Sequence, residues 1–233
     1  MNRLLLLLPA FALTAACCQA PEAPPEDSVK PGINDSFLDP SLDVQDFVER
    51  FEVESREIFS ERLAIVAAVD VQEGMAIADI GAGTGLFVPY FSQSVGSDGK
   101  VYAVDISPGM LEHLHARKAD EGWSNVDVVP CSERSANLPE DSVDRVFVCD
   151  TYHHFEYPRA TMSSIREALR DGGEVVIVDF ERIPGVTRAW LLDHVRCGKE
   201  TVITEMRSFG FELIEEVDMA GLSENYLLRF REQ

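Results

Sequence analysis

An acid followed by a run of glycines, and a second acid further along, form the strongest chemical signal in this chain. An apolar segment ends near Asp79, and Gly81, Ala82 and Gly83 follow directly. A second apolar segment ends in Asp105. Glycines let the backbone turn sharply and approach a ligand closely, and a carboxylate that closes the second strand suits the two hydroxyls of a ribose. The pattern predicts a site for a nucleotide-containing cosubstrate.

The glycine spacing distinguishes between cosubstrates. The third glycine is Gly85, whereas a dinucleotide fingerprint would need glycine at Leu86. The arrangement Asp79-x-Gly81-x-Gly83-x-Gly85 resembles motif I of the class I methyltransferases, which use S-adenosylmethionine. The alternative is a glycine-rich turn in some other α/β domain.

The resemblance implies a set of donor-binding residues: Asp79, Gly81, Ala82, Gly83, Asp105, Ile106, Ser132 and Asp150. Asp79 would help to hold the methionine part, the glycine run would contact the donor through its backbone, and Asp105 would bind the ribose. Ile106 would flank the adenine. The loop that often supplies an aspartate to the adenine amino group lacks one here, so Ser132 or Glu133 is the expected substitute.

A polar run follows the fourth expected strand, with the sequence Cys-Asp-Thr-Tyr-His-His-Phe at 149–155. Because ligands gather at the carboxyl ends of strands in open α/β sheets, Asp150, His153 and His154 are expected to face the donor methyl group and its acceptor. Either histidine is a candidate general base, since imidazole titrates near neutral pH. The alternative is a structural hydrogen bond to a loop carbonyl. The remaining histidines fall on expected helices without partners, so they are expected to face solvent or to be satisfied locally: His113, His115 and His194.

Methyl transfer from a sulfonium is a single in-line displacement, which needs alignment and a dry pocket. It requires no metal, and no metal site is expected. Asp150 and Asp179 would suit a catechol-type metal, but the sequence offers no identifiable third ligand. A short-chain dehydrogenase is excluded, because Tyr152 is followed four residues later by Glu156 and not by lysine.

The elements that must position these residues alternate between strand and helix. One or two amphipathic helices over 42–69 come first. The expected strands are 75–80, 101–105, 126–129, 143–149, 174–179, 212–217 and 226–231, and the expected helices are 86–95, one from Ser107, 158–169 and 189–209. Too little chain separates the last two strands for a crossover, so they should form an antiparallel hairpin. The fold class is α/β: a Rossmann-like, seven-stranded, mostly parallel sheet with a C-terminal antiparallel hairpin and helices on both faces, which looks like the class I methyltransferase fold.

The N-terminal segment is expected to be an export leader. Residues 1–18 combine Arg3, an apolar run and small residues before Cys17. They resemble a bacterial lipoprotein signal, which implies a lipid on Cys17 and a place at the periplasmic face of a membrane. Simple secretion, or a cytoplasmic protein with an unprocessed leader, are the alternatives. Residues 19–40 are rich in proline and acids and are expected to be a disordered tether, which leaves 41–233 as the methyltransferase domain.

Composition limits the partners. The formal net charge is −21 and basic clusters are absent, so nucleic acid is excluded as a partner. The expected partner is a small-molecule methyl acceptor, with membrane contact only through Cys17. The Leu-Pro-x-x-Ser-Val-Asp stretch at 138–144 also resembles the ubiquinone/menaquinone C-methyltransferases. The alternative hypothesis is an exported, lipid-anchored binding protein that keeps the fold but not the reaction.

Overall fold

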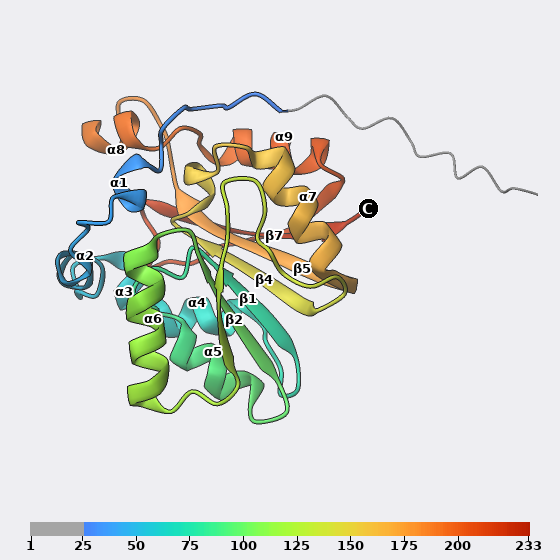
Figure 1. The fold of residues 1–233 in the computed structure, drawn as a ribbon. Helices are drawn as coiled ribbons and strands as arrows, with labels where there is room; N and C mark the ends of the chain where they lie inside the picture. The colour runs from blue at the N-terminus through green and yellow to red at the C-terminus, as the bar shows by residue number, and fades with distance from the viewer. Residues whose placement is uncertain (1–25) are drawn as a thin grey trace, which may run out of the picture.

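The structure, a computed structural model, describes residues 26–233, so the predicted leader and residues 19–25 lie outside the described residues. Seven strands form one sheet in the order β3-β2-β1-β4-β5-β7-β6 (Figure 1). The strands are β1 (Ala76–Ile80), β2 (Lys100–Asp105), β3 (Val126–Pro130), β4 (Val143–Cys149), β5 (Leu169–Phe180), β6 (Phe211–Val217) and β7 (Asn225–Glu232). The pairs from β3 to β5 are parallel, whereas β7 runs antiparallel to β5 and β6. The predicted fold class and C-terminal hairpin are confirmed.

Helices cover both faces of the sheet. The helical elements are α1 (Asp35–Leu38), α2 (Val44–Phe51), α3 (Glu57–Ser60), α4 (Arg62–Val69), α5 (Val88–Val95), α6 (Pro108–Glu121), η1 (Tyr152–His154), α7 (Pro158–Ala168), α8 (Ala189–His194) and α9 (Lys199–Ser208). Buried side chains of α7 and α9 share one core cluster, and those of α4, α5 and α6 share another. Every residue of β1 is buried, which explains why this strand is a continuous apolar run interrupted only by its acid. Within residues 26–233, no helix has the length and apolarity needed to cross a membrane.

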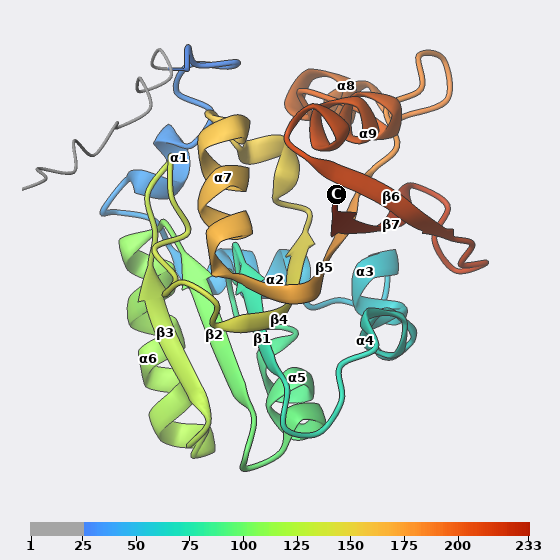
Figure 2. The ribbon, with the colours of Figure 1, turned by 90° about the vertical axis from the view of Figure 1, so that its right-hand side faces the viewer.

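The order in which strands are added to the sheet changes side between β1 and β4, although the two strands are parallel. From β1 the chain adds β2 and β3 on one side, and then returns to add β4 and β5 on the other. Figure 2 shows β3 with α6 toward one edge of the sheet, and β6 and β7 at the other. The carboxyl ends of β1, β2, β4 and β5 therefore meet at a topological switch point, the place where open α/β sheets bind ligands.

The predicted single helix 189–209 is wrong. The structure has two helices, α8 and α9, with an extended segment between them. Val195 and Cys197 in this segment are both buried, whereas a continuous helix would point them about 200° apart. Gly198 starts α9, and a Cβ there would lie 2.9 Å from the Cβ of Arg182. Close packing therefore interrupts the helical pattern.

Residues 26–40, predicted to be part of the tether, pack against the domain. Asn34 is buried, and its Nδ2 donates to the carbonyl of His154 at 3.2 Å. The backbone N–H of Gly32 donates to the carboxylate of Glu156 at 3.1 Å. The carboxylate of Glu26 accepts two N–H groups from the first turn of α7, at 2.9 and 2.8 Å. These contacts are hydrogen bonds and not an apolar core. A composition rich in proline and acids therefore did not reveal that residues 26–40 pack against the domain.

Glu57 joins α3 to the connection between β6 and β7. Its carboxylate accepts backbone N–H groups from Ser223, Glu224 and Asn225 at 2.6–2.7 Å, and the hydroxyl of Ser223 at 3.0 Å. Hydrogen bonds to charged groups contribute about 1.5–3 kcal/mol each, and the donors left behind lose their partner. We expect Glu57→Ala to lower the free energy of unfolding by about 2–3 kcal/mol in urea denaturation.

The matched control is Glu49→Ala on exposed α2, which is expected to change the free energy of unfolding by less than about 0.5 kcal/mol. An equal, small effect of both substitutions would contradict a structural role for Glu57.

Candidate functional site

Four aspartates lie at the carboxyl edge of the sheet. Asp79 and Asp105 belong to the ends of β1 and β2, Asp150 follows β4, and Asp179 is the second-to-last residue of β5. Asp79, Asp105 and Asp179 are buried, with 2%, 6% and 1% of their surface exposed. Buried carboxyl groups are costly without partners, so the contacts of each one indicate what this edge can bind.

The turn after β1 has the backbone that the glycine pattern predicts. Gly81 and Gly83 have φ angles of +74° and +55°, which residues with a Cβ rarely adopt. A Cβ on Gly81 would lie 2.9 Å from the Cβ of Thr151 and closer still to its methyl and hydroxyl groups. A Cβ on Gly83 would meet only the carbonyl of Gly81, at 3.8 Å. The chain therefore packs tightly on one side of the turn and leaves room beside Gly83 for a ligand.

The carboxylate of Asp105 is fixed by the turn and by its own loop. One oxygen accepts the N–H of Gly83 and the other accepts the N–H of Ser107, each at 2.8 Å. Burial raises the pKa of Asp105, and these backbone N–H groups oppose the rise. A carboxylate has about four lone-pair sites, so the remaining ones are available to the hydroxyls of a ligand.

Asp79 has an unsatisfied oxygen. Its Oδ2 is buried and has no hydrogen-bond partner among the described residues. Burial, and secondarily the charge of Asp105, raise its pKa to about 8. A cationic group beside this carboxyl would favour its ionised form and provide the missing partner. The aminoacyl end of S-adenosylmethionine carries such cations, so the residues present fit this cosubstrate.

Asp150 is already engaged by other parts of the chain. It forms an ion pair with Arg56, and its other oxygen accepts from Nδ2 of Asn225 at 2.7 Å. Burial raises the pKa of Asp150 to about 6, against the opposing charge of Arg56. Arg56 immediately precedes α3, so its pairing with Asp150 anchors the N-terminal helices to the end of β4.

The residues expected near the adenine lie beside Asp105. Ile106 is half-buried immediately after it, and the N–H of Cys131 donates to the carbonyl of Asp105 at 2.9 Å. Ser132 is exposed, and its backbone pairs with that of Ser135. The loop after β3 therefore starts beside Asp105, at the proposed donor site. The contacts of Ser132 and Ile106 with adenine remain predictions.

His153 lies on η1, directly after β4, and contacts Asp179 near the end of β5. It is 1% exposed, and its Nδ1 lies 2.7 Å from Oδ1 of Asp179. The backbone N–H of His153 also donates to Oδ2 of Asp179 at 3.0 Å. Burial lowers the pKa of the neighbouring His154 to about 2, with the charges of the other histidines adding to the effect.

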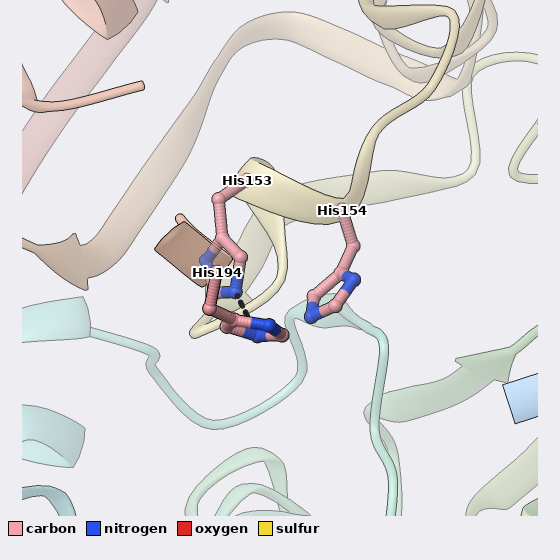
Figure 3. A group of neighbouring side chains, drawn as sticks. All are labelled: His153, His154 and His194. Carbon is pink, nitrogen blue, oxygen red and sulfur yellow. Dashed lines mark hydrogen bonds between the residues drawn. The ribbon is translucent and has the colours of Figure 1, made fainter. Parts of the chain in front are cut away.

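His194 is exposed, as expected, but it does not lack neighbours. Its Nε2 lies 3.3 Å from Nε2 of His153, and its ring centroid is 5.0 Å from that of His154. Figure 3 shows the three rings close together, with ring nitrogens directed toward one another. His194 is 41 residues from His153 along the chain, and no local spacing links them. Only the tertiary placement of α8 brings them together.

Two cavities lie in the part of the chain that the structure describes, and the first reaches Glu181 and Asn225 at the carboxyl end of β5. One, of about 360 Å³, is lined mainly by the β6–β7 hairpin, and the other, of about 400 Å³, lies between α7 and the end of α9. Neither is lined by Asp79, the glycine run or Asp105. The buried unpaired carboxyl and the fixed Asp105 therefore identify the candidate site better than cavity volume does.

The sequence comparisons point to the same segment. Residues 78–177 match a family described as a methyltransferase domain, and this match runs from β1 to β5. Among curated proteins, a ubiquinone/menaquinone biosynthesis C-methyltransferase from Bordetella avium is 26% identical over 118 residues, or 51% of this chain and 46% of that protein. One from Burkholderia cenocepacia is 26% identical over 51% of this chain and 48% of that protein. The chain thus spans about half the length of the curated relatives it matches.

Solved structures share the fold. A SAM-dependent methyltransferase from Aquifex aeolicus has a TM-score of 0.71 at 22% identity, and the match covers 82% of this chain and 98% of that one. A methyltransferase in complex with the Trm112 activator of Haloferax volcanii has a TM-score of 0.69 at 16% identity, covering 86% and 97%. The [4+2]-cyclase SpnF has a TM-score of 0.63 at 16% identity, covering 74% and 80%. One of the similar folds is thus described as a cyclase, so the reaction must be argued from the site.

Proposed function

We propose that this chain is an S-adenosylmethionine-dependent methyltransferase that transfers a methyl group in line to a small molecule. The observation that carries the proposal is the buried carboxyl of Asp79, whose Oδ2 has no partner within residues 26–233, beside an open glycine turn and the fixed carboxylate of Asp105. The match of residues 78–177 to a methyltransferase domain supports it.

Each part of the donor has a group that suits it. Asp79 would face the cationic aminoacyl end, and the backbone from Gly81 to Gly83 would lie against the nucleoside. Asp105 would accept hydrogen bonds from both ribose hydroxyls, while Ile106 and Ser132 would border the adenine. The donor supplies an activated methyl group, so the protein's contribution is to align the reactants and exclude water.

The acceptor would approach from the ends of β4 and β5. Asp150, His153 and His154 are the candidate groups on this side. Of the two histidines, His153 is the one whose ring Asp179 holds in a fixed orientation. A small neutral or cationic acceptor, and not a nucleic acid, is consistent with the net charge of −21.

Calorimetry tests the proposal without knowledge of the acceptor. The chain is titrated with S-adenosylmethionine and with S-adenosylhomocysteine, and saturable one-to-one binding of both is expected. NADH serves as the control nucleotide and is expected not to bind. Absence of binding by both sulfur nucleosides would contradict the proposal and favour a binding protein that keeps the fold without the reaction.

Export is a separate proposal that rests on the sequence of residues 1–18. We expect the mature chain to begin at a lipid-modified Cys17 and to be held at the periplasmic face of a membrane. Mass spectrometry of the membrane-extracted protein from a bacterial host checks this. An intact Met1 would contradict it.

A further inference from the structure

Three histidines from two distant segments form a cluster that the proposed methyl transfer does not require. His153 and His154 lie on η1, and His194 is the last residue of α8. One ring nitrogen from each lies within 4.8 Å of the others, as Figure 3 shows. His153 is buried, His154 is half-buried and His194 is exposed. The cluster therefore reaches from the core to solvent, which gives a small ion a way in.

The spacing of the nitrogens fits a tetrahedral metal ion. Nε2 of His153 and Nε2 of His194 are 3.3 Å apart. Zinc binds histidine nitrogens at about 2.0–2.1 Å, and two ligands at the tetrahedral angle are then roughly 3.3 Å apart. A ring nitrogen of His154 lies within 4.8 Å of the other two, and its ring centroid is 4.3 Å from that of His153.

Asp179 orients His153 so that Nε2 is the ring nitrogen available to a metal ion. Its Oδ1 lies 2.7 Å from Nδ1 of His153, so Nδ1 carries the proton and the lone pair of Nε2 points toward His194. Asp179 is itself fixed by the backbone N–H groups of His153 and Phe180, at 3.0 and 2.7 Å. A carboxylate behind a ligating histidine is the usual outer partner in zinc sites, because it sets the tautomer and raises ligand basicity.

One acidic and one basic side chain lie beside the cluster. Asp179 supplies a negative charge behind His153, while Lys30 lies on the other side. The ammonium of Lys30 donates to the carbonyls of Asp193 and His194, at 3.2 and 2.9 Å. Lys30 is thus held at the end of α8 by these two carbonyls.

We propose that His153, His154 and His194 bind one divalent transition metal ion, with zinc the best match. Neutral imidazoles suit zinc, and three histidines leave a fourth position for water or another oxygen ligand. Metal binding and a base role for His153 would use the same lone pair, so they exclude each other. That consequence rests on the proposed function, whereas the metal site does not.

Calorimetric titration of the full-length, metal-free chain with zinc tests the site. One ion per chain is expected at the cluster, and His194→Gln is expected to weaken its binding by at least tenfold. His194 is exposed, so this variant should fold. The matched control is His115→Gln, which replaces an exposed histidine on α6 and should bind zinc as the unaltered chain does. Asp179→Asn is expected to weaken binding about 10- to 100-fold, the usual effect of losing an outer partner.

Replacement of zinc by cobalt gives a second readout that is independent of activity. A tetrahedral cobalt site absorbs strongly in the visible range, and the His194→Gln variant should lose this absorption. Cys17 and Cys18 lie outside the described residues, and the comparison with His194→Gln separates any zinc that they bind. No zinc binding by the unaltered chain, or equal binding by the His194→Gln variant, would overturn the proposal. Donor binding by the metal-free chain would still decide the proposed function separately.

Discussion

Asp105→Ala is expected to weaken S-adenosylmethionine binding by at least about a hundredfold. The substitution would remove the two hydrogen bonds that Asp105 is proposed to accept from the ribose, each contributing about 1.5–3 kcal/mol. It also releases the N–H groups of Gly83 and Ser107, which Asp105 holds at 2.8 Å. Calorimetry with the donor measures the loss.

Two further variants separate charge from geometry. Asp105→Asn keeps one acceptor oxygen, so its donor affinity should fall between those of the unaltered chain and Asp105→Ala. Asp127→Ala removes the same charge from the exposed side of β3, where Asp127 pairs with Lys100 and Lys118, and it should bind the donor normally. Circular dichroism confirms that each variant is folded. Unchanged affinity in folded Asp105→Ala would remove Asp105 from the site.

Donor binding is expected to become tighter as the pH rises toward 8. Burial raises the pKa of Asp79 from its ordinary value of 3.8 to about 8, so the free protein carries a proton on Asp79 at neutral pH. A cationic donor favours the ionised form, so binding releases this proton. The affinity should therefore rise by up to about tenfold per pH unit below 8 and level off above it.

Calorimetry in buffers of different ionisation enthalpy counts the proton directly. About one proton should be released per donor bound near pH 7, and Asp79→Asn should bind weakly with little pH dependence. The raised pKa of Asp79 also affects the stability of the fold. Because the pKa of Asp79 is higher in the folded than in the unfolded chain, protonated Asp79 contributes its full stabilisation below about pH 4. This contribution is lost as the pH rises through 8. Donor binding without proton release would show that Asp79 does not meet the cation.

The parts of the fold that follow from local pattern were predictable. The strand, glycine turn and helix from Met75 to Val95 follow from a continuous apolar run and from backbone angles that glycine allows. The C-terminal hairpin followed from the short connection between two strands. In contrast, the break between α8 and α9 depends on packing of Val195 and Cys197 against distant elements. The apolar pattern of 189–209 did not reveal this constraint.

The candidate site divides in the same way. Asp79, the glycine run and Asp105 lie within one strand-turn-helix-strand unit, so their spacing carried the prediction. Arg56 and Asp150 are paired across 94 residues, and His153 and His194 across 41. The composition of residues 26–40 indicated a tether. It did not reveal contacts such as the two backbone N–H groups at the start of α7 that donate to Glu26. These contacts depend on the folded sheet, and no local motif encodes them.

A crystal structure of the chain with S-adenosylhomocysteine would locate the proposed donor site. The ribose hydroxyls are expected on the carboxylate of Asp105, the nucleoside against the backbone from Gly81 to Gly83, and the amino group of the ligand on Asp79. A ligand bound at another face, with Asp79 still unpartnered beside the glycine turn, would contradict this placement.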